Sequence, residues 1–114
     1  MEKNYASGKR GSFAKLVDPD QAYIVAEYFS HICTGYKDVL TVLDIAHITG
    51  LNKKSLLKLL KAGHIKSIEC SPRYLVPKLY FLEFATTKRF REIRTNSDRF
   101  NELLEEFDKW KNQR

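Results

Sequence analysis

The feature that most constrains the fold is a pair of short helical patterns joined by a glycine turn near the middle of the chain. Thr41 stands before the first pattern with Asp44 three residues later, which is typical of a capping box at a helix N-terminus. Gly50 follows this pattern and permits the left-handed backbone that ends a helix sharply. Asn52 can cap the second pattern, for which we expect a helix over residues 53–62. Two short helices joined by a turn that contains glycine are typical of a helix-turn-helix.

The second of these helices is expected to be apolar on one side and cationic on the other. Leu56, Leu59 and Leu60 recur at the spacing of a buried stripe. No acidic residue stands between Asp44 and Glu69. The lysines of this acid-free stretch are Lys53, Lys54, Lys58, Lys61 and Lys66.

Positive charge is concentrated in the same part of the chain. The whole sequence has 20 Lys and Arg against 14 Asp and Glu, a net charge of +6. Residues 36–94 alone hold twelve basic and five acidic residues, and the segments before and after them nearly balance. This distribution favours a polyanionic partner, and nucleic acid before a membrane. The alternative is a soluble protein that is basic without such a partner.

A β-hairpin is expected directly after the lysine helix. Residues 64–70 alternate in polarity around two isoleucines, and residues 71–73 (Ser-Pro-Arg) mark a turn. Residues 74–76 are rich in strand formers and are stopped by Pro77. A hairpin that follows a helix pair in this way is a wing.

Helical patterns also flank the central segment. Asp18 and Pro19 begin one of them, and the apolar residues that follow predict a helix over about residues 18–34. After Pro77 a helix resumes and extends towards Ile93. At about 100–200 residues per domain, a chain of 114 residues forms one domain.

A last helix is expected over about residues 97–111, with one apolar face. We expect this face to pack in the core against the helix over 18–34; the alternative is contact with a second copy of the chain or a partner protein. The face consists of Phe100, Leu103, Leu104, Phe107 and Trp110. Residues 1–17 are mostly polar and predict a flexible basic arm before a single domain of residues 18–114.

The segment LTVLDIAHITGLNKKSLLKLLKAGHI resembles the winged helix-turn-helix of the excisionase family, which is related to the MerR-type DNA-binding domain. The resemblance covers about residues 39–85. It departs from the family where Ser71-Pro72 replaces paired glycines at the wing tip, and where Glu69 and Leu75 replace basic residues. The matching positions are Leu40-Thr41, Asp44, Ala46, Gly50, Leu51, Asn52, the lysine helix, Gly63, Arg73-Tyr74 and Pro77.

The resemblance implies a winged helix-turn-helix with a small β-hairpin wing. The flanking helical patterns lie outside it, and together they predict a mainly α fold, a winged helix-turn-helix with added N- and C-terminal helices. It also implies double-stranded DNA as partner, in bacteria and their mobile elements. The expected role is that of an excisionase, a recombination directionality factor that bends DNA and assists a site-specific recombinase (integrase). The alternatives are a transcriptional regulator of a mobile element and a protein-interaction module that has lost DNA binding.

The expected DNA contacts lie on the lysine helix and the wing. Lysine and serine can donate to phosphates or to base acceptors in the major groove. Leu57 either touches a thymine methyl group or packs on an added helix. The expected set is Thr41, Asn52, Lys53, Lys54, Ser55, Leu57, Lys58, Lys61, His64, Lys66, Arg73 and Tyr74.

Several other classes of protein lack support in the sequence. There is no HExxH, CxxC, GxGxxG or P-loop lysine, so we expect no enzymatic activity, no cofactor and no metal. Cys33 and Cys70 are expected to be reduced thiols, at least one of them buried. No apolar run approaches the ~18 residues of a membrane span. The N-terminus has no signal-peptide pattern, which predicts a cytoplasmic protein that is associated with the nucleoid when bound.

Overall fold

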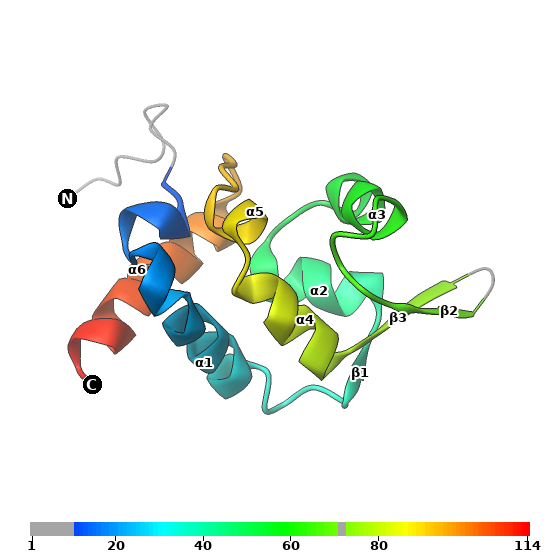
Figure 1. The fold of residues 1–114 in the computed structure, drawn as a ribbon, viewed down its shortest axis with the longest axis horizontal. Helices are drawn as coiled ribbons and strands as arrows, with labels where there is room; N and C mark the ends of the chain where they lie inside the picture. The colour runs from blue at the N-terminus through cyan, green and yellow to red at the C-terminus, as the bar shows by residue number, and fades with distance from the viewer. Residues whose placement is uncertain (1–10, 71–72) are drawn as a thin grey trace.

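The computed structural model describes residues 11–70 and 73–114 (Figure 1). The chain is mainly helical with a small antiparallel sheet, which confirms the expected class. None of the helices in these two ranges is long and apolar enough to cross a membrane. The elements are, in chain order, η2 (Phe13–Lys15), η3 (Pro19–Gln21), α1 (Ala22–Ile32), β1 (Val39–Leu40), α2 (Val42–Thr49), α3 (Lys53–Lys61), β2 (Ile68–Cys70), β3 (Arg73–Pro77), α4 (Lys78–Ala85), α5 (Lys88–Arg91) and α6 (Asp98–Asn112).

The central helix pair begins and ends where its capping residues predict. The Thr41 amide donates to the Asp44 carboxylate at 2.9 Å, and the Asp44 amide donates to the Thr41 hydroxyl at 3.1 Å. Gly50 ends α2 with φ +80°, in the left-handed region. Asn52 begins α3, because its side-chain oxygen accepts a hydrogen bond from the Ser55 amide at 2.7 Å. These three confirmed predictions fix the short connection between α2 and α3.

The hairpin after α3 forms as expected and gains a third strand. β2 and β3 are antiparallel, with Ile68 opposite Leu75. The sequence did not predict β1, which pairs with the other edge of β3 and places Leu40 opposite Val76. The sheet therefore ties the segment before α2 to the segment before α4. The expected turn tip at Ser71-Pro72 lies outside the described residues.

An aromatic cluster occupies the centre of the core, and Phe13 lies in the middle of it. The Phe13 ring centroid is 5.8 Å from that of Phe29, 5.3 Å from Phe90, 5.7 Å from Phe100 and 5.2 Å from Phe107. All five side chains are fully buried. The pairs with Phe100 and Phe107 are edge-to-face and the pair with Phe90 is stacked. Aromatic pairs of these kinds stabilise a core by ~0.5–1.5 kcal/mol each beyond the area that they bury.

The prediction of a flexible arm over residues 1–17 is wrong for its second part. Phe13 and Val17 are buried, and Leu16 packs against the core. The Lys111 ammonium also donates to the Leu16 carbonyl at 2.6 Å, which links this segment to α6. Phe13, Leu16 and Val17 stand at i, i+3 and i+4, the spacing of an apolar helical face, and this short pattern was a signal of their burial. Residues 1–10 of the expected arm lie outside the described residues.

The apolar face of α6 belongs to the core. Phe100, Leu103, Leu104 and Phe107 are all buried within the chain, as the packing interpretation predicts. These four side chains are covered within the chain, so of the five residues named for a dimer or partner contact only Trp110 is partly exposed. Trp110 is half-buried, and its ring centroid lies 5.4 Å from that of Tyr28 on α1. The Arg114 guanidinium lies over the Trp110 ring, 5.1 Å from its centroid.

The N-terminus of α6 rests on the turn between α2 and α3. A Cβ placed on Gly50 would lie 2.6 Å from the Ser97 hydroxyl and 2.7 Å from both the Arg99 Cβ and the Phe100 amide nitrogen. Ser97 is itself the N-cap of α6, because its hydroxyl accepts a hydrogen bond from the Phe100 amide at 3.2 Å. Gly50 is thus required twice, for its backbone angle and for this close approach.

Alanine substitutions at three glycines separate these two requirements. Gly63→Ala should lower the free energy of unfolding by about 1–2 kcal/mol, because Gly63 has φ +81°, although an added Cβ would meet no neighbour there. Gly50→Ala should cost about 1–3 kcal/mol more, because α6 must also move. Gly35→Ala, in open space without a positive φ, should lie within about 0.5 kcal/mol of wild type. Urea denaturation measures all three, and equal losses at Gly50 and Gly63 would contradict the α6 contact.

Stability should decline at alkaline pH through Tyr28. Burial, reinforced by the negative charge of Glu106, raises the pKa of Tyr28 well above its ordinary 10.0. The neutral phenol is favoured in the folded state, so its contribution is fully present below pH 10 and is lost as the pH rises above that value. Tyr28→Phe should flatten this decline, whereas Tyr23→Phe, at an exposed side chain of the same helix, should leave it unchanged. Free energies of unfolding measured between pH 8 and about 11 test this linkage.

Candidate nucleic-acid interface

The outer side of α3 is a cationic surface, as the sequence predicts. Leu56 and Leu60 are buried and hold the helix against the core. Ser55 is exposed on the outer side, between the lysines. Among the residues whose side chains the structure describes, no ion pair joins the α3 lysines to a carboxylate. The exposed lysines of this helix are Lys53, Lys54, Lys58 and Lys61.

These charges lie where they do not stabilise the helix. Lys53 and Lys54 occupy the first turn of α3, which contains no acidic residue. The helix dipole disfavours cations at that end by ~0.3–1 kcal/mol each. Lys54 and Lys58 also stand four residues apart on one face, where like charges repel by a few tenths of a kcal/mol. Local rules of stability are broken most often at functional sites, so this arrangement indicates one.

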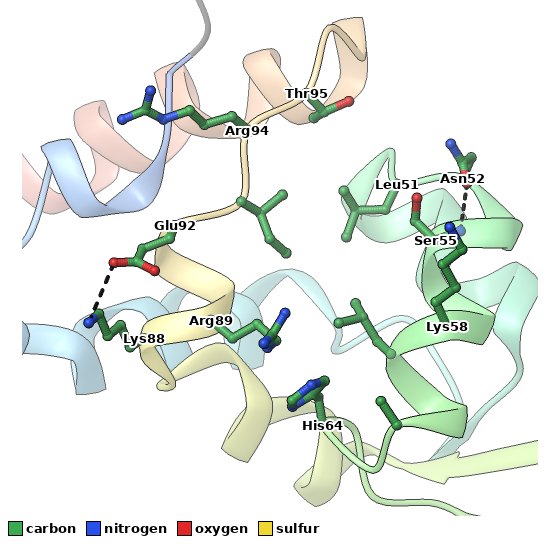
Figure 2. Close-up of a pocket in the computed structure, with 13 residues that line it drawn as sticks. Leu51, Asn52, Ser55, Lys58, His64, Lys88, Arg89, Glu92, Arg94 and Thr95 are labelled. Atoms are coloured by element: carbon green, nitrogen blue, oxygen red, sulfur yellow. Dashed lines mark hydrogen bonds and ion pairs between the residues drawn. The ribbon is translucent and has the colours of Figure 1, made fainter.

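An open groove of about 900 Å³ runs along one side of α3 (Figure 2). Its first wall is α3 with the residues that flank it on both sides, and its second wall is α5 with the segment that follows. The first wall consists of Leu51, Asn52, Ser55, Lys58, Leu59, Ala62 and His64. The second consists of Lys88, Arg89, Glu92, Ile93, Arg94 and Thr95.

The second wall exists because the helix after the hairpin breaks. It was expected to continue from Pro77 towards Ile93, but α4 ends at Ala85 and α5 is a separate helix. The Thr87 hydroxyl donates to the Phe84 carbonyl at 2.7 Å and accepts from the Phe90 amide at 3.2 Å, so it closes one helix and caps the next. This local hydrogen bonding competes with continuation of a helix.

Two of the four residues of α5 are buried and two are exposed. Phe90 is in the aromatic cluster, and the buried Arg91 donates to the Thr86 carbonyl at 2.9 Å. Lys88 and Arg89 are exposed. Arg89 extends from α5 towards α3 in Figure 2. This wall was not among the expected contacts, although the run of basic residues around Phe90 was a signal for it.

The groove is strongly positive. Lys58, Lys88, Arg89 and Arg94 are among its lining residues together with His64, and its single carboxylate belongs to Glu92. In Figure 2 Arg89 extends towards α3, whereas Lys88, Glu92 and Arg94 extend away from it. That carboxylate lies 3.9 Å from the Lys88 ammonium, an exposed pair that leaves the remaining cations unbalanced. Within the two described ranges, no group of three or more His, Cys, Asp or Glu could hold a metal ion.

The other residues expected at the interface are more scattered. Arg73 is exposed on β3, and Tyr74 is half-buried against the core. Lys66 is exposed but lies 3.8 Å from Glu83 on α4, an exposed pair of the kind that contributes at most ~1 kcal/mol. Thr41 is engaged as the cap of α2.

Leu57 and Cys33 take structural positions. Leu57 is half-buried and packs against the core, which favours the packing interpretation over contact with a thymine methyl group. Cys33 is a buried free thiol, as expected for at least one cysteine, and burial raises its pKa. A thiol of this kind is a poor nucleophile, because the thiolate is the reactive form.

Comparisons of the chain with protein-family models, with curated proteins and with solved structures find no match. The candidate interface therefore rests on the geometry of α3, the groove beside it and the charges that line both.

Arg91 should hold the second wall in place. Arg91→Ala removes a charge-assisted hydrogen bond to the α4 C-terminus, and such bonds contribute about 1.5–3 kcal/mol. Arg89→Ala, at the exposed arginine two residues earlier, should change the free energy of unfolding by less than about 0.5 kcal/mol. Urea denaturation compares the two variants. Equal stability of the variants would show that Arg91 does not anchor α5.

Proposed function

We propose that this chain is a DNA-binding protein of the winged helix-turn-helix type, with α3 as the recognition helix. One observation carries the proposal: α3 exposes four lysines that no described carboxylate neutralises, while its leucines hold it in the core. The element order α2, α3, β2 and β3, with its short glycine turn, supports the same assignment.

The dimensions of the helix suit the partner. An α-helix with its side chains is about 10–12 Å across, and the major groove of B-DNA is about 12 Å wide. The exposed lysines surround the outer face of α3, so phosphates on both sides of the groove come within reach of flexible ammonium groups. Lysine and serine in the first turn can also donate to guanine acceptors. We therefore propose strong backbone contacts and modest reading of base sequence.

Within this class we propose the role of a recombination directionality factor of excisionase type. Such a protein carries out no chemistry and acts by placing and bending DNA for a recombinase. A footprint at an attachment site would support this role. A footprint over a promoter alone would assign the chain to transcriptional regulation instead.

Duplex binding should depend steeply on salt. About four to six phosphate contacts give a slope of log Kd against log salt with a magnitude near 4–5. The double variant Lys53→Ala, Lys54→Ala should reduce that magnitude by about 2, since each phosphate contact contributes about 0.9. Fluorescence anisotropy with a labelled duplex from 50 to 300 mM salt measures the slope.

The control variant is Lys15→Ala, Lys109→Ala, which removes two exposed cations away from α3 and should retain the wild-type slope. The α3 double variant should be as stable as wild type or slightly more stable, because it removes cations from a helix N-terminus. If the wild-type chain binds no duplex even at low salt, the proposed function is wrong.

A further inference from the structure

We infer that the groove between α3 and α5 holds one sugar-phosphate strand of the bound duplex, so that α5 and residues 92–95 form a second DNA contact. This inference rests on the proposed function and extends it to a wall outside the helix pair and the hairpin. The proposed contact is with backbone phosphate, not with the bases.

The groove lies directly beside α3, the proposed recognition helix. A helix that enters the major groove has a sugar-phosphate strand on each side of it, because those two strands border the groove. One flank of α3, with Ser55, Lys58 and Ala62, forms the first wall of the hollow. A strand that borders the major groove on this flank would therefore lie in the space between α3 and α5. This space is open and has a volume of about 900 Å³.

Both walls of the groove also carry positive charge. Lys58 stands on the α3 wall, and Arg89 extends towards it from the α5 wall (Figure 2). His64 lies below them and adds a donor at the end of the groove. A phosphate between these walls would meet an ammonium from one side and a guanidinium from the other. Arginine binds phosphate oxygens in a two-pronged geometry that lysine cannot copy.

The α5 wall is also anchored to the rest of the fold. Phe90 and Arg91 are buried, and the hydrogen bond from Arg91 to Thr86 ties α5 to the end of α4. The exposed Arg89 therefore follows the hydrogen-bonded turn at Thr87 and directly precedes the two anchored residues, Phe90 and Arg91. A cation on an anchored helix loses less freedom when it binds than one on a loose segment.

The test compares salt slopes for variants of the full chain that carry the same net charge. Arg89→Ala, Arg94→Ala should lower the slope of log Kd against log salt by about 1–2 in magnitude, at about 0.9 per phosphate contact. Lys15→Ala, Lys109→Ala removes the same charge elsewhere and should leave the slope unchanged. Thermal unfolding should give similar midpoints for both, because all four side chains are exposed.

A substitution of opposite sign provides a second arm. Glu92 is the acidic residue of the second wall and pairs with Lys88 on the side turned away from α3, so Glu92→Gln frees a cation beside the groove and should strengthen binding several-fold at low salt. Asp20→Asn removes one negative charge from an exposed position outside the groove and should have little effect. Arg89→Lys should retain most of the salt slope, because it keeps the charge.

The outcomes separate the two proposals. If the Arg89, Arg94 variant binds duplex with the wild-type salt slope, or its slope falls no more than that of the Lys15, Lys109 control, the second contact is overturned. In that case α3 remains the proposed interface. If Glu92→Gln gains no more than Asp20→Asn, the strand does not lie in the groove. If the wild-type chain binds no duplex, both proposals fall together.

Discussion

The packing of Phe13 among four other phenylalanine rings is the interaction on which the rest of the structure depends. The rings come from η2, α1, α5 and α6, segments that lie at opposite ends of the chain. Burying a phenylalanine contributes about 1.5–3 kcal/mol, so the cluster can hold elements too short to be stable alone. α5 has four residues and persists because Phe90 is part of this cluster. The wall that faces α3 is thus a product of the terminal segments.

The nine residues of α3 divide between those that attach the helix to the core and those that carry its charge. Leu56 and Leu60 provide the attachment of α3, while its lysines oppose the helix dipole and repel each other. A helix of this length forms in water only when tertiary packing supports it. The cost of the lysines is therefore met by the leucines and by the Asn52 cap. A partner with negative charge would relieve the repulsion, which is why the arrangement indicates binding.

Features with a local cause could be predicted from the sequence. The caps of α2 and α3, the glycine that separates them and the hairpin each depend on residues within a few positions of one another. The cationic face of α3 could be predicted for the same reason, since a helical repeat places the leucines and lysines on opposite sides. The buried face of α6 followed from its apolar spacing.

Features whose cause lies far away in the sequence could not be predicted. β1 consists of Val39 and Leu40, and only its pairing with β3 makes it a strand. Phe13 shares only a short apolar pattern with Leu16 and Val17, and its burial depends on rings that are up to 94 residues away in sequence. The second wall of the groove requires both the break at Thr87 and the burial of Phe90. No local pattern contains that combination, so half of the candidate site was missed.

The contact between Gly50 and the start of α6 has a consequence for how this chain can change over time. A DNA-reading helix pair is often treated as a portable unit that can be exchanged between proteins. Here the turn of that unit is shaped to the backbone of a helix almost fifty residues later. A transplanted copy of residues 39–85 would lose the contact between its turn glycine and the start of α6. The helix pair and the C-terminal helix must therefore be inherited together, and substitutions in one constrain those accepted in the other.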